Sequence, residues 1–226
     1  MEKTLIDKHV LEKDFFKKIN QNIMPFKIMM TKYHCALMQV DTKFKVLDEE
    51  FSLKYNYNPI ESIKTRLKTP ESIFEKVNNK NISLSSLSIG DLEENIKDIA
   101  GVRIICSFIE DIYTLRDCLS KQDDVIIISE KDYIKNPKSN GYRSLHLIIE
   151  VPVFFQDQKI YVKVEVQFRT IAMDFWASLE HKVKYKKDVP KELENSFQLE
   201  LLECAEVSHL LDMKMEKIKN RLFHPK

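Results

Sequence analysis

Tyr161-Val162-Lys163-Val164-Glu165-Val166-Gln167-Phe168-Arg169 is the most regular stretch of this 226-residue chain. Its apolar and polar side chains alternate without a break, which predicts a β-strand with one apolar and one polar face. Glu165 is the one carboxylate of the polar face and has cationic or amide neighbours on both sides. A solvated strand face shows the same pattern, so this stretch alone fits either a functional site or a plain exposed surface.

Other segments rich in β-branched residues lie on both sides of helical segments in the middle of the chain. The expected strands are residues 99–108, 125–129, 145–151 and 160–168, and the expected helices are 110–121 and 170–185. Strands that alternate with helices predict an α/β or α+β core with a mixed sheet.

Regular apolar stripes mark both ends of the chain. Apolar residues recur every three or four positions from 27 to 55 and again from 204 to 222, the second time after a helix-start signal at Asp188-Val189-Pro190. Each stripe fits a subunit interface or packing on the chain's own core. We expect an N-terminal helical extension at 1–58, a core at 59–187 and a C-terminal helical extension at 188–226.

The composition limits the possible partners. Net charge is +1, from 36 basic and 35 acidic residues, so any phosphate site must be local, and a nucleic-acid partner is only a minor alternative. No apolar run approaches the roughly 18 residues that span a bilayer, and no signal-peptide core follows the first residues. The four scattered cysteines suggest buried free thiols in the reducing cytoplasm, with a zinc site from distant Cys and His as a lesser possibility.

Residues 66–76 predict the start of an anion-binding helix. Thr69 is a good N-cap, and Pro70 suits the first helical position. Backbone N–H groups and the helix dipole favour anions at such an end, so a triphosphate fits, although a solvated charged helix start remains an alternative. The side chains expected to contact phosphate are Arg66, Lys68, Ser72 and Lys76.

Two carboxylates suggest a metal site. Asp98 is expected to open the strand at 99–108, and Glu165 lies on another strand of the same sheet. Magnesium is commonly held by one or two carboxylates together with phosphate oxygens and water, so Asp98 and Glu165 predict a Mg²⁺ site. The alternative for Asp98 is a helix or turn cap.

The turn-rich segment 135–143 leads into the strand at 145–151. Lys138 and His146 suit phosphate, and Tyr142 beside Gly141 suits stacking on a base, although a strand-start tyrosine with an exposed hydroxyl has the same sequence context. Neither of the common glycine-rich phosphate fingerprints occurs in the chain.

Three motifs in combination resemble the synthetase domain of the RelA/SpoT family, in particular the RelP branch of the small alarmone synthetases. They are Asp98-Ile99-Ala100-Gly101-Val102-Arg103, Asn140-Gly141-Tyr142-Arg143-Ser144-Leu145-His146 and Glu165-Val166-Gln167-Phe168-Arg169-Thr170. The stretch at 171–182 is also similar, and the resemblance spans about 59–187. Phe168 stands where the family more often has isoleucine, on the apolar face, so we expect no effect on chemistry.

The resemblance implies a GTP pyrophosphokinase that moves the terminal pyrophosphate of ATP to the 3′-hydroxyl of GTP or GDP, releasing AMP and making (p)ppGpp. It also implies a nucleotidyltransferase-like mixed sheet and a homotetramer assembled through the terminal helices. The paired His and Asp residues of the family's hydrolase domain are not found in the sequence. We therefore expect synthesis only.

The family's residue roles carry over to positions in this chain. Asp98 and Glu165 match the magnesium carboxylates, and Glu165 also matches the candidate base for the acceptor hydroxyl. The ATP side comprises Arg66 and Arg103 as the pair that sandwiches adenine, with Lys68, Ser72 and Lys76 at the phosphates. The acceptor side comprises Tyr142 stacked on guanine, Lys138, Asn140 and His146 toward the phosphates, and Gln167 near the nucleoside.

Two other functions remain possible from sequence. One is a non-catalytic guanine-nucleotide or RNA-binding regulator on the same scaffold, although a pure binder has no need of both metal carboxylates. The other is a nucleotidyltransferase that adds a nucleoside monophosphate to an acceptor and releases pyrophosphate.

Overall fold

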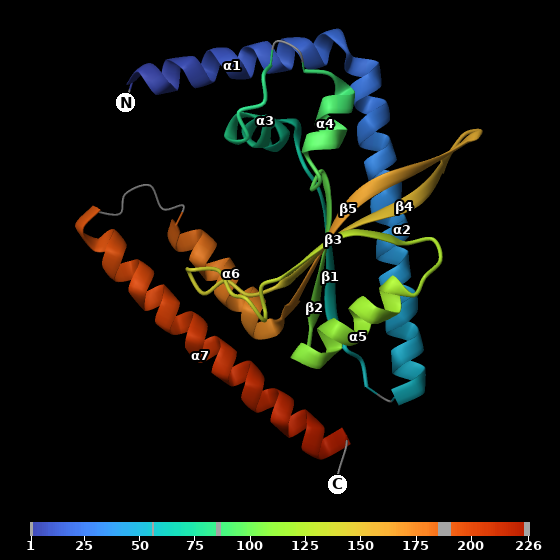
Figure 1. Ribbon diagram of the computed structural model, residues 1–226, viewed down its shortest axis with the longest axis vertical. Coiled ribbons are helices and arrows are strands. Elements are labelled where there is room, and N and C mark those ends of the chain that lie inside the picture. Colours follow the sequence, from blue (N-terminus) through green and yellow to red (C-terminus); the bar gives the residue numbers. More distant parts are fainter. Residues whose placement is uncertain (1, 56, 85–86, 185–190, 224–226) are drawn as a thin grey trace.

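A five-stranded mixed sheet forms the centre of the computed structural model (Figure 1), which describes the chain except for residues 1, 56, 85–86, 185–190 and 224–226. The strand order is β1-β2-β5-β4-β3; β2 and β5 are parallel, and the other neighbouring pairs are antiparallel. The strands are β1 Ile60–Leu67, β2 Ala100–Cys106, β3 Ile126–Asp132, β4 Leu145–Phe155 and β5 Gln158–Thr170. The expected mixed-sheet fold is confirmed.

Helices precede, follow and interrupt the sheet. They are α1 Glu2–Gln21, α2 Ile23–Tyr55, α3 Pro70–Asn79, α4 Ile89–Asn95, α5 Ile109–Ser120, α6 Ile171–Lys184 and α7 Lys191–Phe223. The predicted helices over 27–55, 110–121 and 170–185 correspond to α2, α5 and α6. The helix-start signal at 188–190 and the boundary expected at 187 lie outside the described residues.

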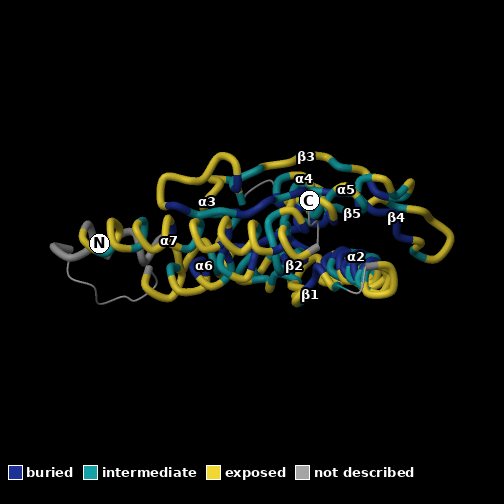
Figure 2. Tube along the Cα trace, turned by 90° about the horizontal axis from the view of Figure 1, so that it is seen from below, coloured by how far each residue is buried: buried dark blue, intermediate teal, exposed yellow. Residues whose placement is uncertain are grey.

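The apolar face of β5 builds the core. Val162, Val164, Val166 and Phe168 are at most 6% exposed, as the alternation predicts. Phe168 meets Phe44 of α2 edge to face, with ring centroids 5.6 Å apart. The tube in Figure 2 shows α2 along one side of the sheet with its buried side toward the strands. The opposite, polar face of β5 is therefore the one available for a site.

Two expected features of the strands are corrected by the structure. Asp98 does not open β2; it lies in the turn between α4 and β2, which begins at Ala100. The solvated-face alternative for β5 is also wrong, because the side chain of Glu165 is 19% exposed and that of Arg169 only 7%. Alternation fixes which side chains share a face, but it does not say what covers that face.

The two terminal stripes have different roles. In α2 the stripe that includes Tyr33, Leu37, Val40 and Phe44 is buried on the chain's own sheet. In α7 the stripe is turned outward, with Val207, Leu211 and Leu222 all more than half exposed. The helix contacts its own chain instead through its buried residues Ala205, Asp212 and Lys219.

The outward stripe of α7 also corrects the expectation for the cysteines. All four are free, and Cys106 is buried as expected, but Cys204 is exposed on α7. Over the part of the chain that the structure describes, no helix combines the length and apolarity needed to cross a lipid bilayer.

Candidate active site

A carboxylate and two lysines meet near the start of α3, in front of the first residue of β2. Lys68 Nζ lies 3.1 Å and Lys76 Nζ 3.2 Å from Asp98 Oδ2. Burial favours the neutral carboxyl, but the charges and hydrogen bonds of the two lysines outweigh it and hold the pKa of Asp98 below its usual value. Asp98 is therefore an anion held by cations.

The helix start beside this cluster has the predicted form. Thr69 is the N-cap of α3, and its side-chain oxygen accepts a hydrogen bond of 3.3 Å from the backbone N–H of Ser72. Pro70 occupies the first helical position. The half-buried side chain of Ser72 thus lies at a helix N-terminus, beside the lysines that hold Asp98.

Glu165 lies in the middle of the polar face of β5. His146 Nδ1 of β4 is 3.3 Å from Glu165 Oε1, and Gln167 Nε2 donates to Oε2 over 2.8 Å. Burial would raise the pKa of Glu165, but the hydrogen bonds and charge of His146 and the bond from Gln167 keep that pKa below its usual value. The negative charge of Asp98 opposes them, so the two carboxylates are close enough to repel each other.

Sheet register explains why these carboxylates approach. β2 and β5 are parallel neighbours, and Glu165 is the register partner of Gly101. Asp98 lies three residues before Gly101 in the chain, in the turn that leads into β2. Both side chains therefore lie in the same region of the sheet, although residue 165 comes 67 positions after residue 98 in the sequence.

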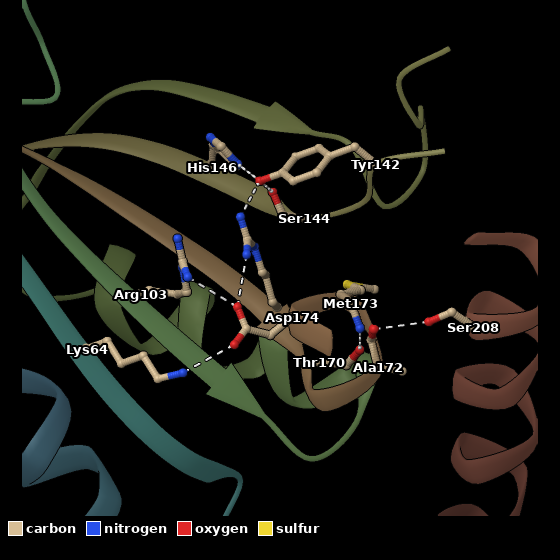
Figure 3. A network of polar contacts seen from close by, with 11 residues as sticks. Lys64, Arg103, Tyr142, Ser144, His146, Thr170, Ala172, Met173, Asp174 and Ser208 are labelled. Carbon is tan, nitrogen blue, oxygen red and sulfur yellow. Dashed lines mark hydrogen bonds and ion pairs between the residues drawn. The ribbon is translucent and has the colours of Figure 1, made fainter. Parts of the chain in front are cut away.

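Tyr142 joins the loop before β4 to this polar face (Figure 3). Its hydroxyl accepts hydrogen bonds from Ser144 Oγ at 3.0 Å and Arg169 Nη2 at 2.9 Å, and lies 2.9 Å from His146 Nε2. Since the hydroxyl accepts twice, its own proton is directed to Nε2 of His146. The other ring nitrogen of His146, Nδ1, faces Glu165.

The remaining loop residues surround Tyr142. Lys138 Nζ lies 4.8 Å from the Tyr142 ring centroid. Asn140 Oδ1 accepts from the Tyr142 backbone N–H at 3.2 Å, and its side-chain nitrogen donates to Glu180 over 3.2 Å. Lys138 and Asn140 thus contact Tyr142, whose hydroxyl contacts His146. His146 and Gln167 both contact Glu165.

Arg103 and Arg66 come from the adjacent strands β2 and β1. Arg103 donates to Asp174 over 3.3 Å and its side chain is 36% exposed; Arg66 is exposed, and no contact of its side chain is described. Burial, followed by the positive charge of Arg169 and to a smaller extent that of Arg66, lowers the pKa of Arg103. Arg66 is the register partner of Gly101, two residues before Arg103, so the two arginines lie near each other on neighbouring strands.

Two carboxylates and the surrounding cations suit a hard metal ion with a phosphate ligand. Asp98 and Glu165 offer oxygen ligands, which Mg²⁺ prefers, and Mg²⁺ completes its shell with phosphate and water. Within the described residues no three His, Cys, Asp or Glu side chains group as a metal site. A pair of carboxylates is nevertheless enough for magnesium bound together with a nucleotide.

Sequence reasoning missed three residues of this network. Lys64 and Arg169 donate to Asp174, and Asp174 has no predicted role even though it lies in the stretch that resembles the family. The available signal was a carboxylate placed five residues after Arg169, at the first turn of the following helix. Only the fold shows that β1 and β2 bring two further cations to it.

Comparison with known proteins points to the same family as the sequence motifs. The family model described as "Region found in RelA / SpoT proteins" matches residues 65–189. GTP pyrophosphokinase YwaC of Bacillus subtilis is 47% identical over 96% of this chain and 100% of its own length.

Solved structures give the same result. Small alarmone synthetase 2 from B. subtilis is 49% identical with a TM-score of 0.75, over 87% of this chain and 98% of that one. Small alarmone synthetase 1 from B. subtilis, bound to its product pppGpp, is 32% identical with a TM-score of 0.75, over 87% of this chain and 97% of that one. This chain belongs to the RelA/SpoT family, among its small alarmone synthetases.

Proposed function

We propose that this protein transfers the terminal pyrophosphate of ATP to the 3′-hydroxyl of GTP or GDP, with release of AMP and formation of (p)ppGpp. The observation that carries the proposal is a pair of ionised carboxylates, Glu165 on the polar face of β5 and Asp98 in the turn that leads into the neighbouring strand β2. Cations lie beside Asp98, and an aromatic ring with a histidine lies beside Glu165. This arrangement suits a donor triphosphate on one side and an acceptor nucleoside on the other. It is supported by the pyrophosphokinase relatives and the pppGpp-bound homologue.

On the donor side, ATP binds at the start of α3 and between two arginines. Lys68 and Lys76, which hold Asp98 here, are placed to pair with phosphate oxygens, and Ser72 adds a hydroxyl. Arg66 and Arg103 enclose the adenine. Charge that builds on the transferred group is stabilised by these fixed cations, which is the main source of catalysis in phosphoryl transfer.

On the acceptor side, the guanine base stacks on Tyr142, with Gln167 near the nucleoside. Lys138, Asn140 and His146 lie toward the acceptor phosphates. Glu165 is the general base for the 3′-hydroxyl, because its hydrogen bonds keep it ionised at neutral pH. The 3′-oxygen then attacks the β-phosphorus of ATP in line, and AMP leaves.

Asp98 and Glu165 would hold the Mg²⁺ that the reaction requires. The donor set fits, since both side chains offer carboxylate oxygens that their neighbours keep ionised. Bound there, the ion neutralises negative charge on the phosphates. The cytoplasm is the compartment that supplies ATP, GTP and free magnesium together, and we place the protein there.

We further propose a homotetramer assembled through the terminal helices. α7 packs on its own chain through Ala205, Asp212 and Lys219 and leaves a long apolar stripe outside. Exposed apolar residues of α1 and α2 add to the same type of surface, among them Val10, Met24, Ile28 and Met38. A second copy of the chain would cover these stripes. In the proposed division of the chain, the core spans 59–187, and the helical extensions at 1–58 and 188–226 both serve assembly.

Incubation of the purified protein with ATP, Mg²⁺ and each of GTP, GDP and GMP, followed by nucleotide separation, tests the proposed reaction. The expected products are AMP and a guanosine nucleotide with two added phosphates, for GTP or GDP. Release of pyrophosphate instead of AMP would indicate nucleotidyl transfer. Binding of guanine nucleotide without any product would favour a non-catalytic regulator.

A further inference from the structure

Asp174 lies at the meeting point of three cations from three strands (Figure 3). It stands in the first turn of α6, directly after β5. Its Oδ1 accepts from Arg169 Nη1 at 2.9 Å and from Arg103 Nη1 at 3.3 Å, and its Oδ2 accepts from Lys64 at 3.2 Å. The side chain is 13% exposed, so these contacts are largely shielded from water.

Arg169 carries the influence of Asp174 to Tyr142. One terminal nitrogen of its buried guanidinium binds Asp174, and the other donates to the Tyr142 hydroxyl over 2.9 Å. The guanidinium carbon also lies 5.3 Å from the Tyr142 ring centroid. Because the guanidinium is a rigid planar fork, the position of Asp174 sets the position of the tyrosine. From Tyr142 the network continues through His146 to Glu165.

Arg103 depends on the same carboxylate. Burial and the positive charge of Arg169 both lower the pKa of Arg103, while the negative charge of Asp174 acts in the opposite direction. Two guanidinium groups that contact one oxygen atom repel each other, and a negative charge on that oxygen offsets the repulsion. Removal of the charge would therefore release both arginines and not just one.

We propose that Asp174 is a positioning residue that holds Arg103 of the ATP subsite and, through Arg169, Tyr142 of the acceptor subsite. One carboxylate thus fixes the relative placement of the two nucleotides. The inference rests on the proposed function, because the two subsites are assigned there. The contacts of Asp174 are with Lys64, Arg103 and Arg169, so it acts on the substrates through these cations.

A purely structural role for Asp174 makes a different prediction. A carboxylate in the first turn of a helix stabilises that helix through the dipole. Loss of this effect lowers the midpoint of thermal unfolding of the protein. It leaves the Michaelis constants of correctly folded molecules unchanged. Michaelis constants measured separately for each substrate therefore distinguish the two roles.

The main test is Asp174→Asn, which keeps the shape of the side chain and removes its charge. Asp157→Asn, an identical exchange on the exposed β4–β5 turn, is the control and should behave as wild type. We expect Asp174→Asn to raise the KM for ATP and the KM for GDP by about tenfold each, since loss of a charged hydrogen bond has effects of this order. The kcat should fall less than either KM rises. An increase for one substrate only, or for neither, would overturn the shared role.

A double variant tests the route to the acceptor. Tyr142→Phe removes the hydroxyl that Arg169 holds. In this background Asp174→Asn should add little further increase in the KM for GDP, while its effect on the KM for ATP stays in full. Additive effects on GDP would show that Asp174 does not act through the tyrosine.

Arg169→Lys provides a second route if Asp174→Asn does not fold. Lysine keeps the charge but lacks the two separate terminal nitrogens, Nη1 and Nη2, that bind Asp174 and Tyr142 in fixed positions, so the KM for GDP should rise and that for ATP should stay near wild type. An equal rise in the KM for GDP and the KM for ATP, or no rise in either, would contradict the inference. Failure of the proposed function is separate, because the wild-type protein would then make no (p)ppGpp with either acceptor.

Discussion

At the scale of single residues, Tyr142 shows how contacts assign a specific role. Its hydroxyl is bound by Ser144, Arg169 and His146, so the ring is held in place before any ligand binds. We predict that Tyr142→Ala raises the KM for GDP by roughly 10- to 100-fold, because base–aromatic stacking contributes about 1–3 kcal/mol. The KM for ATP should change far less. Steady-state kinetics with each substrate varied in turn checks this, and equal effects on both would contradict the stacking role.

Asp212 predicts a pH dependence of stability. It lies on α7, accepts from Thr170 over 2.6 Å, and burial raises the pKa of Asp212 to about 6. A folded-state pKa above the unfolded value means that the native state binds the proton more tightly. The contribution to stability is then complete below about pH 4 and is lost as the pH rises through about 6.

The variant Asp212→Asn keeps the neutral form at every pH. Its amide oxygen can still accept from Thr170, so we expect it to be more stable than wild type above pH 6, by on the order of 1–3 kcal/mol. The difference should shrink toward zero near pH 4. Urea unfolding at a series of pH values measures it; a constant difference across the range would mean that Asp212 is ionised in the folded protein.

At the scale of elements, α7 packs against the loop that carries Tyr142. Gly141 has φ +84°, and a Cβ at that position would lie 2.5 Å from the Ala205 Cβ. We predict that Gly141→Ala destabilises the protein by about 1–3 kcal/mol, because it combines backbone strain with a clash. The displaced loop should also raise the KM for GDP more than that for ATP.

Gly90→Ala is the matched control for this exchange. Gly90 lies in α4, where the nearest atom to a new Cβ is 3.7 Å away, so the variant should be neutral or slightly stabilised. Thermal unfolding and kinetics of both variants check the prediction. A Gly141→Ala protein as stable as the Gly90→Ala protein would show that the loop does not pack on α7 as described.

The strands and helices differed in how well the sequence predicted them. β5 was predictable because perfect alternation has one interpretation, and α3 because Thr69 and Pro70 combine a cap with a first helical residue. β1 was missed: Ile60–Leu67 is a sheet-edge strand without alternating burial. The burial of Arg169 was also missed, since one of its two partners, Tyr142, belongs to a loop that is distant in sequence.

The site residues remain predictions from the motifs. The motifs identified Asp98, Glu165 and the loop residues, because a family resemblance assigns roles to matching positions. Asp174 could not be assigned, because its partners Lys64 and Arg103 reach it only through strand pairing. Residues that act by holding others have no local pattern of their own, and a structure is needed to find them.

At the scale of the whole molecule, the outward stripe of α7 predicts assembly. Leu211→Glu places a charge in the middle of this stripe, where the leucine is 53% exposed in the single chain. We expect light scattering after gel filtration to give a tetramer mass for wild type and a smaller mass for this variant. Phe154→Glu, at an exposed position of β4 and outside the terminal helices in sequence, should remain a tetramer. A Leu211→Glu protein of unchanged mass would remove α7 from the interface.

The catalytic proposal depends on Asp98 and Glu165 acting together at one divalent ion. The most direct test measures (p)ppGpp formation by Glu165→Gln and Asp98→Asn as Mg²⁺ is titrated, with nucleotide binding followed by calorimetry. We predict that both variants still bind nucleotide but lose at least about 10²-fold in turnover, which added Mg²⁺ does not restore. Near-normal turnover in either variant at ordinary Mg²⁺ concentration would contradict the shared carboxylate site.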